Sequence, residues 1–117
     1  MPAGGISIHC VDVSRGRVAT GLRVSLARLS GETLAQGTVG DKGVWDHAAL
    51  LSEAIVAGGY EVLFEVGDFY RGLGIALPQP AFLEVVPYRF HIADASQHWH
   101  LPFKFTPWGY SLFRGGA

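Results

Sequence analysis

Short segments in which apolar and polar residues alternate recur along this chain, and they restrict its fold more than any other feature. A period of two places every second side chain on the same face of an extended strand, which is typical of a half-buried β-strand. The segments with this pattern are 6–11, 22–27, 60–66, 85–92 and 98–105. The alternation therefore predicts an all-β protein.

The residues between these segments predict how the strands are connected. Turn-forming clusters occur at 14–17, 30–32, 40–43 and 94–97, and residues 33–38 are expected to pair antiparallel with 22–27. Seven or so short strands in 117 residues favour a β-sandwich, as a single domain over 1–117.

Irregular elements are expected in three places. Asp68 is a candidate cap for a short helix that ends at about Leu73, with Gly74 as its stop. The run 44–57 has some helical character but is not favoured as a helix. Pro87 must lie at an edge or at the start of its strand.

The charge balance excludes several function classes. Nine Lys and Arg oppose ten Asp and Glu, for a net charge of −1, so no basic surface for nucleic acid or an anionic membrane is expected. No apolar run approaches the roughly 20 residues of a membrane span, and no secretory leader is visible. Cys10 is the single cysteine, which excludes an intrachain disulfide and favours a reducing compartment such as the cytoplasm.

Histidine is the residue type most suggestive of chemistry. Of the five, His98 and His100 share the polar face of one strand, and His9 lies on the outward face of the first strand beside Ser7. Imidazole suits proton transfer near neutral pH, although outward histidines are also commonly just solvated. The His-x-His pair His98 and His100, with His9 as a third ligand, is only a weak signal for a metal site, because no acidic residue or cysteine lies at a sequence spacing typical of metal ligands. No metal is therefore expected.

The other candidates are expected to be structural. Cys10 lies on the apolar face of its strand and should be a buried hydrophobe rather than a nucleophile. His47 and His91 are expected at the surface. Ser111 lacks the sequence context of a serine nucleophile.

Beyond these patterns, nearly the whole chain resembles the transthyretin and hydroxyisourate hydrolase family. Family members open with a His-x-x-Asp strand, or Lys-x-x-Asp in transthyretin itself, and here His9 to Asp12 is followed by Gly16, Ala19 and Gly21. The tail is similar to the hydrolase signature His-Tyr-His-Val-Pro, Ser-Pro-x-x-Tyr-Ser and Tyr-Arg-Gly-Gly or Tyr-Arg-Gly-Ser. The matching segments here are 98–102, 107–111 and 113–116.

The resemblance implies a transthyretin-like sandwich of seven to eight strands with one short helix, assembled as a homotetramer of paired dimers. Its hydrolase branch opens the ring of 5-hydroxyisourate, a product of urate oxidation, with water and no cofactor. By position, the implied catalytic residues are His9, His100 and Arg114. The residues expected to contact the cyclic substrate are Val44, His98, Lys104, Ser111 and Phe113.

Two positions depart from the family pattern. The family usually has an arginine after Thr-x-x-Asp-Gly, where this chain has Val44, and the tyrosine of the C-terminal tetrapeptide is replaced by Phe113. Lys104, which replaces a family leucine, or Lys42 is a candidate to supply the missing cation. The alternative is that Lys104 is a solvent-exposed lysine on a sheet face with no role in catalysis.

Three functions therefore stay open. The first is a cofactor-free hydrolase of 5-hydroxyisourate or a closely related cyclic ureide. The second is a diverged enzyme that acts on another cyclic amide or lactone, and the third is a non-catalytic small-molecule binder like transthyretin. His9 favours an enzyme, because transthyretin carries lysine there. If the family assembly holds, the apolar fraction of 49% with only 16% charged residues reflects subunit interfaces.

Overall fold

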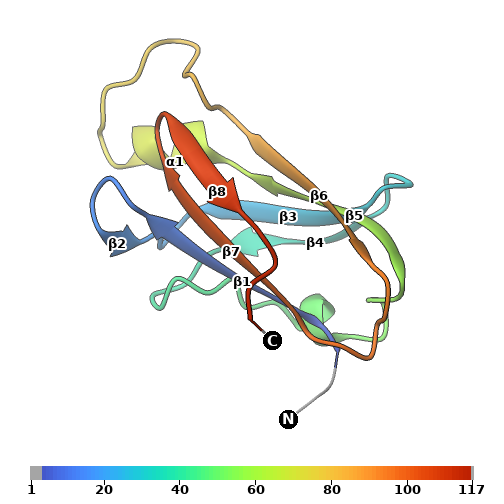
Figure 1. Cartoon of the computed structure of the whole chain (residues 1–117). Coiled ribbons are helices and arrows are strands. Elements are labelled where there is room, and N and C mark those ends of the chain that lie inside the picture. Colours follow the sequence, from blue (N-terminus) through green and yellow to red (C-terminus); the bar gives the residue numbers. More distant parts are fainter. Residues whose placement is uncertain (1–3, 117) are drawn as a thin grey trace.

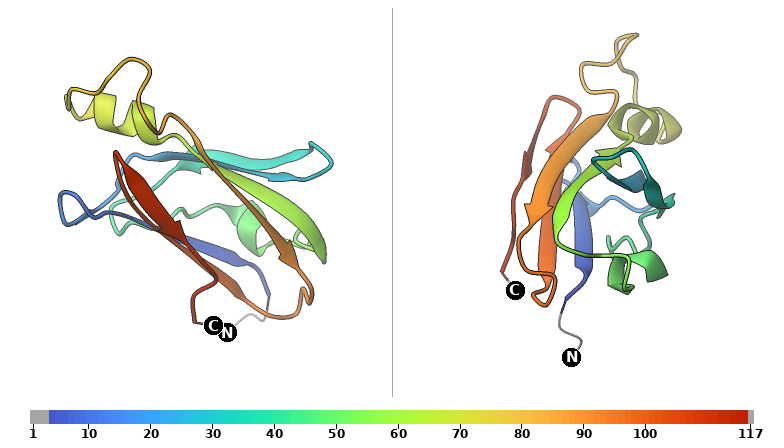
Figure 2. Two further views of the ribbon diagram at one scale, coloured as in Figure 1. Left: turned by 45° about the horizontal axis from the view of Figure 1, so that its top comes forward. Right: turned by 90° about the vertical axis from the view of Figure 1, so that its right-hand side faces the viewer.

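Two four-stranded sheets lie face to face in this computed structural model, which describes residues 4–116 (Figure 1; Figure 2 gives two further views). One sheet has the order β2-β1-β7-β8 and the other β4-β3-β5-β6. The predicted β-sandwich is confirmed. Its strands are β1 (Ile6–Asp12), β2 (Arg17–Val18), β3 (Arg23–Arg28), β4 (Thr33–Thr38), β5 (Gly58–Phe64), β6 (Val86–Ile92), β7 (Trp99–Thr106) and β8 (Gly109–Leu112).

The pairing of β1 with β7 is the feature that matters most for function. The two strands run parallel, and their register sets Ser7 opposite His100 and His9 opposite Pro102. Figure 1 shows the blue first strand beside the orange-red β7, so the two ends of the sequence meet in the middle of one sheet. All other strand pairs are antiparallel, including the expected pair β3–β4.

Alternation in the strands produces the core between the sheets. In β1 the apolar residues Ile6, Ile8 and Cys10 are buried, and the residues between them are half-buried on the outward face. Across the sandwich, the rings of Phe64 and Phe103 stack with centroids 4.0 Å apart. Cys10 is fully buried, and burial raises the pKa of its thiol, which confirms the hydrophobic rather than the nucleophilic interpretation.

The α-helix begins earlier than the sequence indicated. Helix α1 (Val66–Gly72) has Glu65 at its N-cap, without a side-chain capping bond, so the expectation that Asp68 caps it is wrong. Asp68 instead lies in the first turn and pairs with Arg71 at 2.8 Å. The predicted stop is confirmed, because Leu73 is the C-cap and Gly74 follows with a φ of 77°.

The run 44–57 contains only a short 3-10 helix, Ala48–Leu51. His47 is its N-cap, and its Nδ1 accepts a 3.0 Å hydrogen bond from the Ala49 backbone N–H. His47 is therefore half-buried and structural, which corrects the expectation of a surface residue, whereas His91 is exposed as expected. Pro87 lies near the start of the edge strand β6, as it must.

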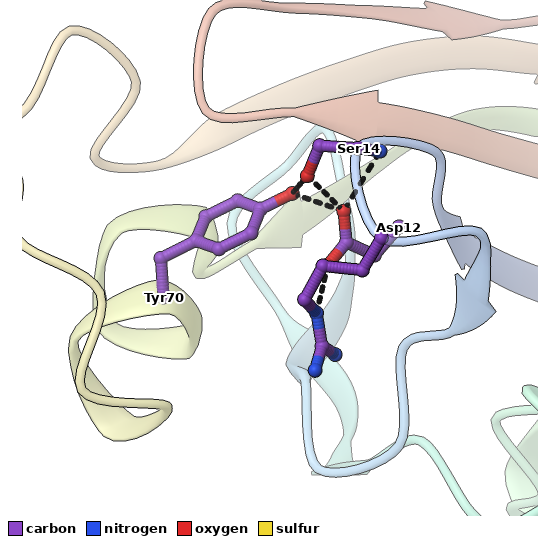
Figure 3. A network of polar contacts seen from close by, with 4 residues as sticks. Asp12, Ser14 and Tyr70 are labelled. Atoms are coloured by element: carbon purple, nitrogen blue, oxygen red, sulfur yellow. Dashed lines mark hydrogen bonds and ion pairs between the residues drawn. The ribbon is translucent and has the colours of Figure 1, made fainter.

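A buried carboxylate ties the end of β1 to α1 (Figure 3). Asp12 has no exposed surface and accepts hydrogen bonds from Tyr70 Oη at 2.7 Å, from Ser14 Oγ at 2.6 Å and from Arg15 Nε at 2.6 Å. Burial by itself would raise the pKa of the Asp12 carboxyl, but the hydrogen bonds from Ser14, Arg15 and Tyr70 outweigh it and hold the pKa below its ordinary value. This network fixes the strand that carries His9.

Within residues 4–116, no helix is both long enough and apolar enough to cross a bilayer.

Candidate active site

Three imidazoles gather on the outward face of the β2-β1-β7-β8 sheet. His9 comes from β1, His100 from β7, and His98 from the residue before β7. All three are half-buried, as is Ser7, which stands opposite His100 in the parallel register. The alternation of each strand places its polar residues outward, and the parallel pairing then brings them together.

One serine hydroxyl joins two of the histidines. Ser7 Oγ lies 2.6 Å from His100 Nδ1 and 2.8 Å from His98 Nε2. The other ring nitrogen of His98, Nδ1, lies 2.9 Å from the Gly4 carbonyl oxygen. The hydrogen bonds among residues 4–116 include none to His100 Nε2, so this nitrogen is available to a substrate or water.

The surroundings of His100 favour its neutral form. Burial lowers the pKa of its imidazole first, because the charged form loses hydration, and repulsion from any positive charge on His9 or His98 lowers it further. A neutral imidazole at neutral pH is the form required to accept a proton from water.

The loop 40–44 covers the His9 side of the cluster. Val44 forms an isolated antiparallel bridge with His9, and the Gly43 carbonyl accepts a 2.8 Å hydrogen bond from the Cys10 backbone N–H. Gly43 has a φ of +80°, and a Cβ there would lie 2.9 Å from His9 Nε2. Glycine at this position therefore lets the loop approach the His9 ring closely.

The C-terminal segment covers His100 in a similar way. The Gly115 backbone N–H donates a 2.7 Å hydrogen bond to the His100 carbonyl oxygen. A Cβ at Gly115 would lie 2.9 Å from His100 Cδ2 and 3.0 Å from Pro102 Cγ. The tail thus packs against the imidazole, and only a glycine fits without a shift.

Arg114 lies beside the cluster but points along β7. Its guanidinium stacks on the Trp99 ring, 4.0 Å from the ring centroid, and donates hydrogen bonds to Gln97 Oε1 at 3.1 Å and to the His98 carbonyl oxygen at 3.2 Å. Among the described residues, its hydrogen bonds therefore go to Gln97 and to the His98 backbone rather than to an imidazole side chain.

The remaining predicted residues are more peripheral. Ser111 and Lys104 are exposed and stand opposite one another in the β7–β8 ladder, and Lys104 is also opposite Val11 of β1. Phe113 is exposed after β8. Lys42 is exposed at the tip of the loop before Val44. The five ion pairs found within residues 4–116 involve neither lysine.

A cavity of about 310 Å³ opens next to the cluster. Ser7, His98, Val44, Asp46 and His47 line it. Apolar residues form the rest of its wall: Ile6, Trp45, Leu50 and Leu51. A larger hollow of about 420 Å³ lies over β3 and β4, but no histidine lines it, so we place the chemistry at the smaller cavity.

Three residues of this arrangement were missed as site residues by the sequence reasoning: Ser7, Gly43 and Gly115. Ser7 shares the outward parity of His9, which was a usable signal, but its partners are more than 90 residues away. The two glycines carry no side-chain signal at all. Among residues 4–116, no group of three or more His, Cys, Asp or Glu side chains has an arrangement suited to a metal ion.

Comparisons with known proteins agree with this architecture. Residues 6–115 match the sequence model of the HIUase/Transthyretin family. The chain is 40% identical to 5-hydroxyisourate hydrolase 2 of Rhizobium meliloti, over 97% of each chain, and 37% identical to 5-hydroxyisourate hydrolase of Deinococcus radiodurans, over 95% of each.

Solved structures give the same result. The structure of Klebsiella pneumoniae 5-hydroxyisourate hydrolase superposes with a TM-score of 0.81 at 33% identity, covering 97% of this chain and 99% of that one. The structure of (S)-allantoin synthase superposes with a TM-score of 0.90 at 28% identity, but this chain spans only 44% of its length. The chain described here belongs to the HIUase/Transthyretin family.

Proposed function

We propose that this protein is a cofactor-free hydrolase that opens the ring of 5-hydroxyisourate, a step of urate degradation. The observation that carries the proposal is the meeting of His9, His98 and His100 on one sheet face, next to a 310 Å³ cavity that Ser7 and His98 help to line. The relatives of the chain over nearly its whole length are named 5-hydroxyisourate hydrolases. Those relatives favour the first of the three functions that the sequence left open.

The chemistry follows from the state of the imidazoles. Neutral His100 accepts a proton from water at Nε2 as the water oxygen adds to a ring carbonyl carbon. The amide C–N bond then breaks, and the leaving ring nitrogen takes up a proton. We assign His9 as the second catalytic histidine, and Arg114 as a cation that stabilises the developing oxyanion, which requires its side chain to turn from Trp99 toward the substrate.

The replacement of the family arginine by Val44 leaves an apolar side chain beside His9. We propose that Lys104 or Lys42 supplies the cation instead. Lys104 has the same outward parity as His100 but lies four residues further along β7, about 13 Å at the ordinary strand rise. Unchanged turnover in Lys104→Ala would exclude this role for Lys104.

Substrate contacts are proposed for Val44, His98, Lys104, Ser111 and Phe113. We also propose a homotetramer of paired dimers that works in the cytoplasm, with part of the exposed apolar surface forming subunit contacts. Large exposed apolar residues support an interface: Val44, Phe82, Trp108, Tyr110 and Phe113 are each at least 40% exposed in the protomer. A monomer at micromolar concentration by light scattering would exclude this assembly.

The decisive experiment follows the ultraviolet decay of freshly generated 5-hydroxyisourate with and without protein. The proposal expects decay faster than the spontaneous rate, and expects His9→Ala and His100→Ala each to lose about 10²-fold or more in kcat/KM. His91→Ala is the matched control, because this histidine is exposed on the other sheet. Decay at the spontaneous rate with folded wild-type protein would rule the function out.

A further inference from the structure

Ser7 occupies a position that constrains where the protons of two histidines lie. A serine hydroxyl has one hydrogen to donate, although its oxygen can accept more than one hydrogen bond. In this structure the Ser7 hydroxyl has two imidazole nitrogens within hydrogen-bond distance, His98 Nε2 at 2.8 Å and His100 Nδ1 at 2.6 Å. It can therefore donate to only one of them.

A backbone carbonyl determines which of the two nitrogens receives the Ser7 hydrogen. The Gly4 carbonyl oxygen lies 2.9 Å from His98 Nδ1, and a carbonyl oxygen only accepts, so His98 Nδ1 carries a proton. In neutral His98 the other nitrogen, Nε2, is then unprotonated and accepts from the Ser7 hydroxyl. The Ser7 hydrogen is thereby used, and His100 Nδ1 must be the donor to Ser7 Oγ.

We propose that Ser7 is a positioning residue that holds neutral His100 in the Nδ1–H tautomer, with the unprotonated Nε2 left to act as the base. The chain of hydrogen bonds runs from His100 through Ser7 and His98 to the Gly4 carbonyl. The role of Nε2 as a base rests on the proposed hydrolase function, whereas the tautomer does not.

The same geometry couples the protonation of His98 to the tautomer of His100. When His98 gains a proton, its Nε2 becomes a donor, Ser7 Oγ accepts from it, and the hydroxyl hydrogen turns to His100 Nδ1. His100 then carries its proton on Nε2.

When His100 Nε2 takes a proton from water, the His100 ring can therefore stay neutral, because it gives up its Nδ1 proton at the same time. The Nδ1 proton passes to Ser7 Oγ, and the hydroxyl proton passes to His98 Nε2. The reverse transfer restores the starting state after Nε2 has given its proton to the leaving nitrogen.

Among residues 4–116, no Lys, Arg, Asp or Glu side chain is hydrogen-bonded to Ser7 Oγ, His98 Nε2 or His100 Nδ1. His9 on β1 contributes to the lowered pKa of His100 but is not in the hydrogen-bond chain, and Asp46 and His47 line the same cavity as Ser7 and His98. Arg114 reaches only the backbone oxygen of His98, and the C-terminal segment contacts His100 through Gly115.

The test is ¹⁵N NMR of the histidine side chains in the full-length protein, recorded well above the pKa of the imidazoles. In wild type, the His100 signals should show a protonated Nδ1 and an unprotonated Nε2. Ser7→Ala should populate the Nε2–H tautomer of His100 and lower kcat/KM by about 10²-fold or more, because a base in the wrong tautomer cannot accept the proton. Ser7→Thr keeps the hydroxyl and should restore both the tautomer and most of the activity.

A second variant keeps the proposal testable if Ser7→Ala does not fold. His98→Phe removes the acceptor for the Ser7 hydrogen, so the hydroxyl is free to donate to His100 Nδ1 and the Nε2–H tautomer should appear there too. A wild-type His100 protonated on Nε2 would overturn the proposal. The expected tautomer without any acceleration of 5-hydroxyisourate decay would instead refute only the proposed function.

Discussion

Val44 forms a β-bridge with His9, which places the residue that replaces the family arginine directly beside one of the two proposed catalytic imidazoles. The side chain is 40% exposed and borders the 310 Å³ cavity, so a longer side chain at this position has room to reach toward a substrate. Position 44, where the chain departs from the family pattern, therefore lies beside the proposed site.

The first prediction restores a cation at this position. Val44→Arg should raise kcat/KM for 5-hydroxyisourate by about 10-fold or more, because a guanidinium next to the His9 bridge would stabilise negative charge that develops on the substrate oxygen. Initial rates of ultraviolet decay measure the effect. Val44→Met is the control for side-chain length and should give no such gain. An equal gain in both variants would show that packing, and not charge, limits the enzyme.

The second prediction concerns pH. Because burial and the neighbouring His9 and His98 lower the pKa of His100, its NMR titration midpoint should lie below 6.5, the ordinary value for histidine. The neutral base then persists below pH 6.5, and kcat/KM should start to fall only at that lower pH. Added salt screens the contribution of the two histidines and should raise the midpoint slightly. A midpoint above 6.5 would contradict this account.

The third prediction concerns the close contact of the tail with His100. Gly115→Ala adds a Cβ 2.9 Å from His100 Cδ2, so the imidazole must shift, and kcat/KM should fall by up to about 10²-fold. Gly116→Ala is the matched control, since a Cβ there meets nothing within 4 Å in the protomer. Both variants should have the same urea midpoint as wild type within error. Equal activity of the two variants would argue against a close catalytic role for the tail.

The fourth prediction concerns the buried Asp12 carboxylate. Tyr70→Phe removes a hydrogen bond to a buried charge and should lower the free energy of unfolding by about 1.5–3 kcal/mol at pH 7, measured by urea denaturation. Tyr88→Phe is the control and should change little, because the hydrogen bonds among residues 4–116 include none from its hydroxyl.

The effect of Tyr70→Phe on stability should also depend on pH. The folded-state pKa of Asp12 lies below its ordinary value of 3.8, so the stabilisation by the carboxylate is fully present only well above pH 3.8. That stability is lost as pH falls through the lower folded-state pKa, and the difference between wild type and Tyr70→Phe should narrow with it. A difference that stays constant down to pH 2 would show that the Tyr70 bond does not depend on the charge of Asp12.

Much of the fold could be predicted from local patterns, because each strand buries every second side chain. The buried set in β1 and the outward set in β7 are those that the alternation indicated, and Gly74 follows the end of α1 as expected. The start of α1 was predicted three residues late, with Asp68 in place of Glu65 as the N-cap, because Asp68 has the chemistry of a cap but makes an ion pair with Arg71 instead. His47 was misplaced for a similar reason, since its capping bond depends on a 3-10 turn with no clear sequence signal.

The sequence by itself determined which residues face outward, and the family motifs selected His9 and His100 among them. Only the tertiary structure decided that β1 and β7 lie parallel in a register that sets Ser7 against His100 and within reach of His98. The physical reason is that alternation fixes the face of a residue, whereas the neighbouring strand and its register depend on contacts between segments more than 90 residues apart. The lack of a side chain at Gly43 and Gly115 lets the chain approach His9 and His100 closely, and this role is visible only in the tertiary structure.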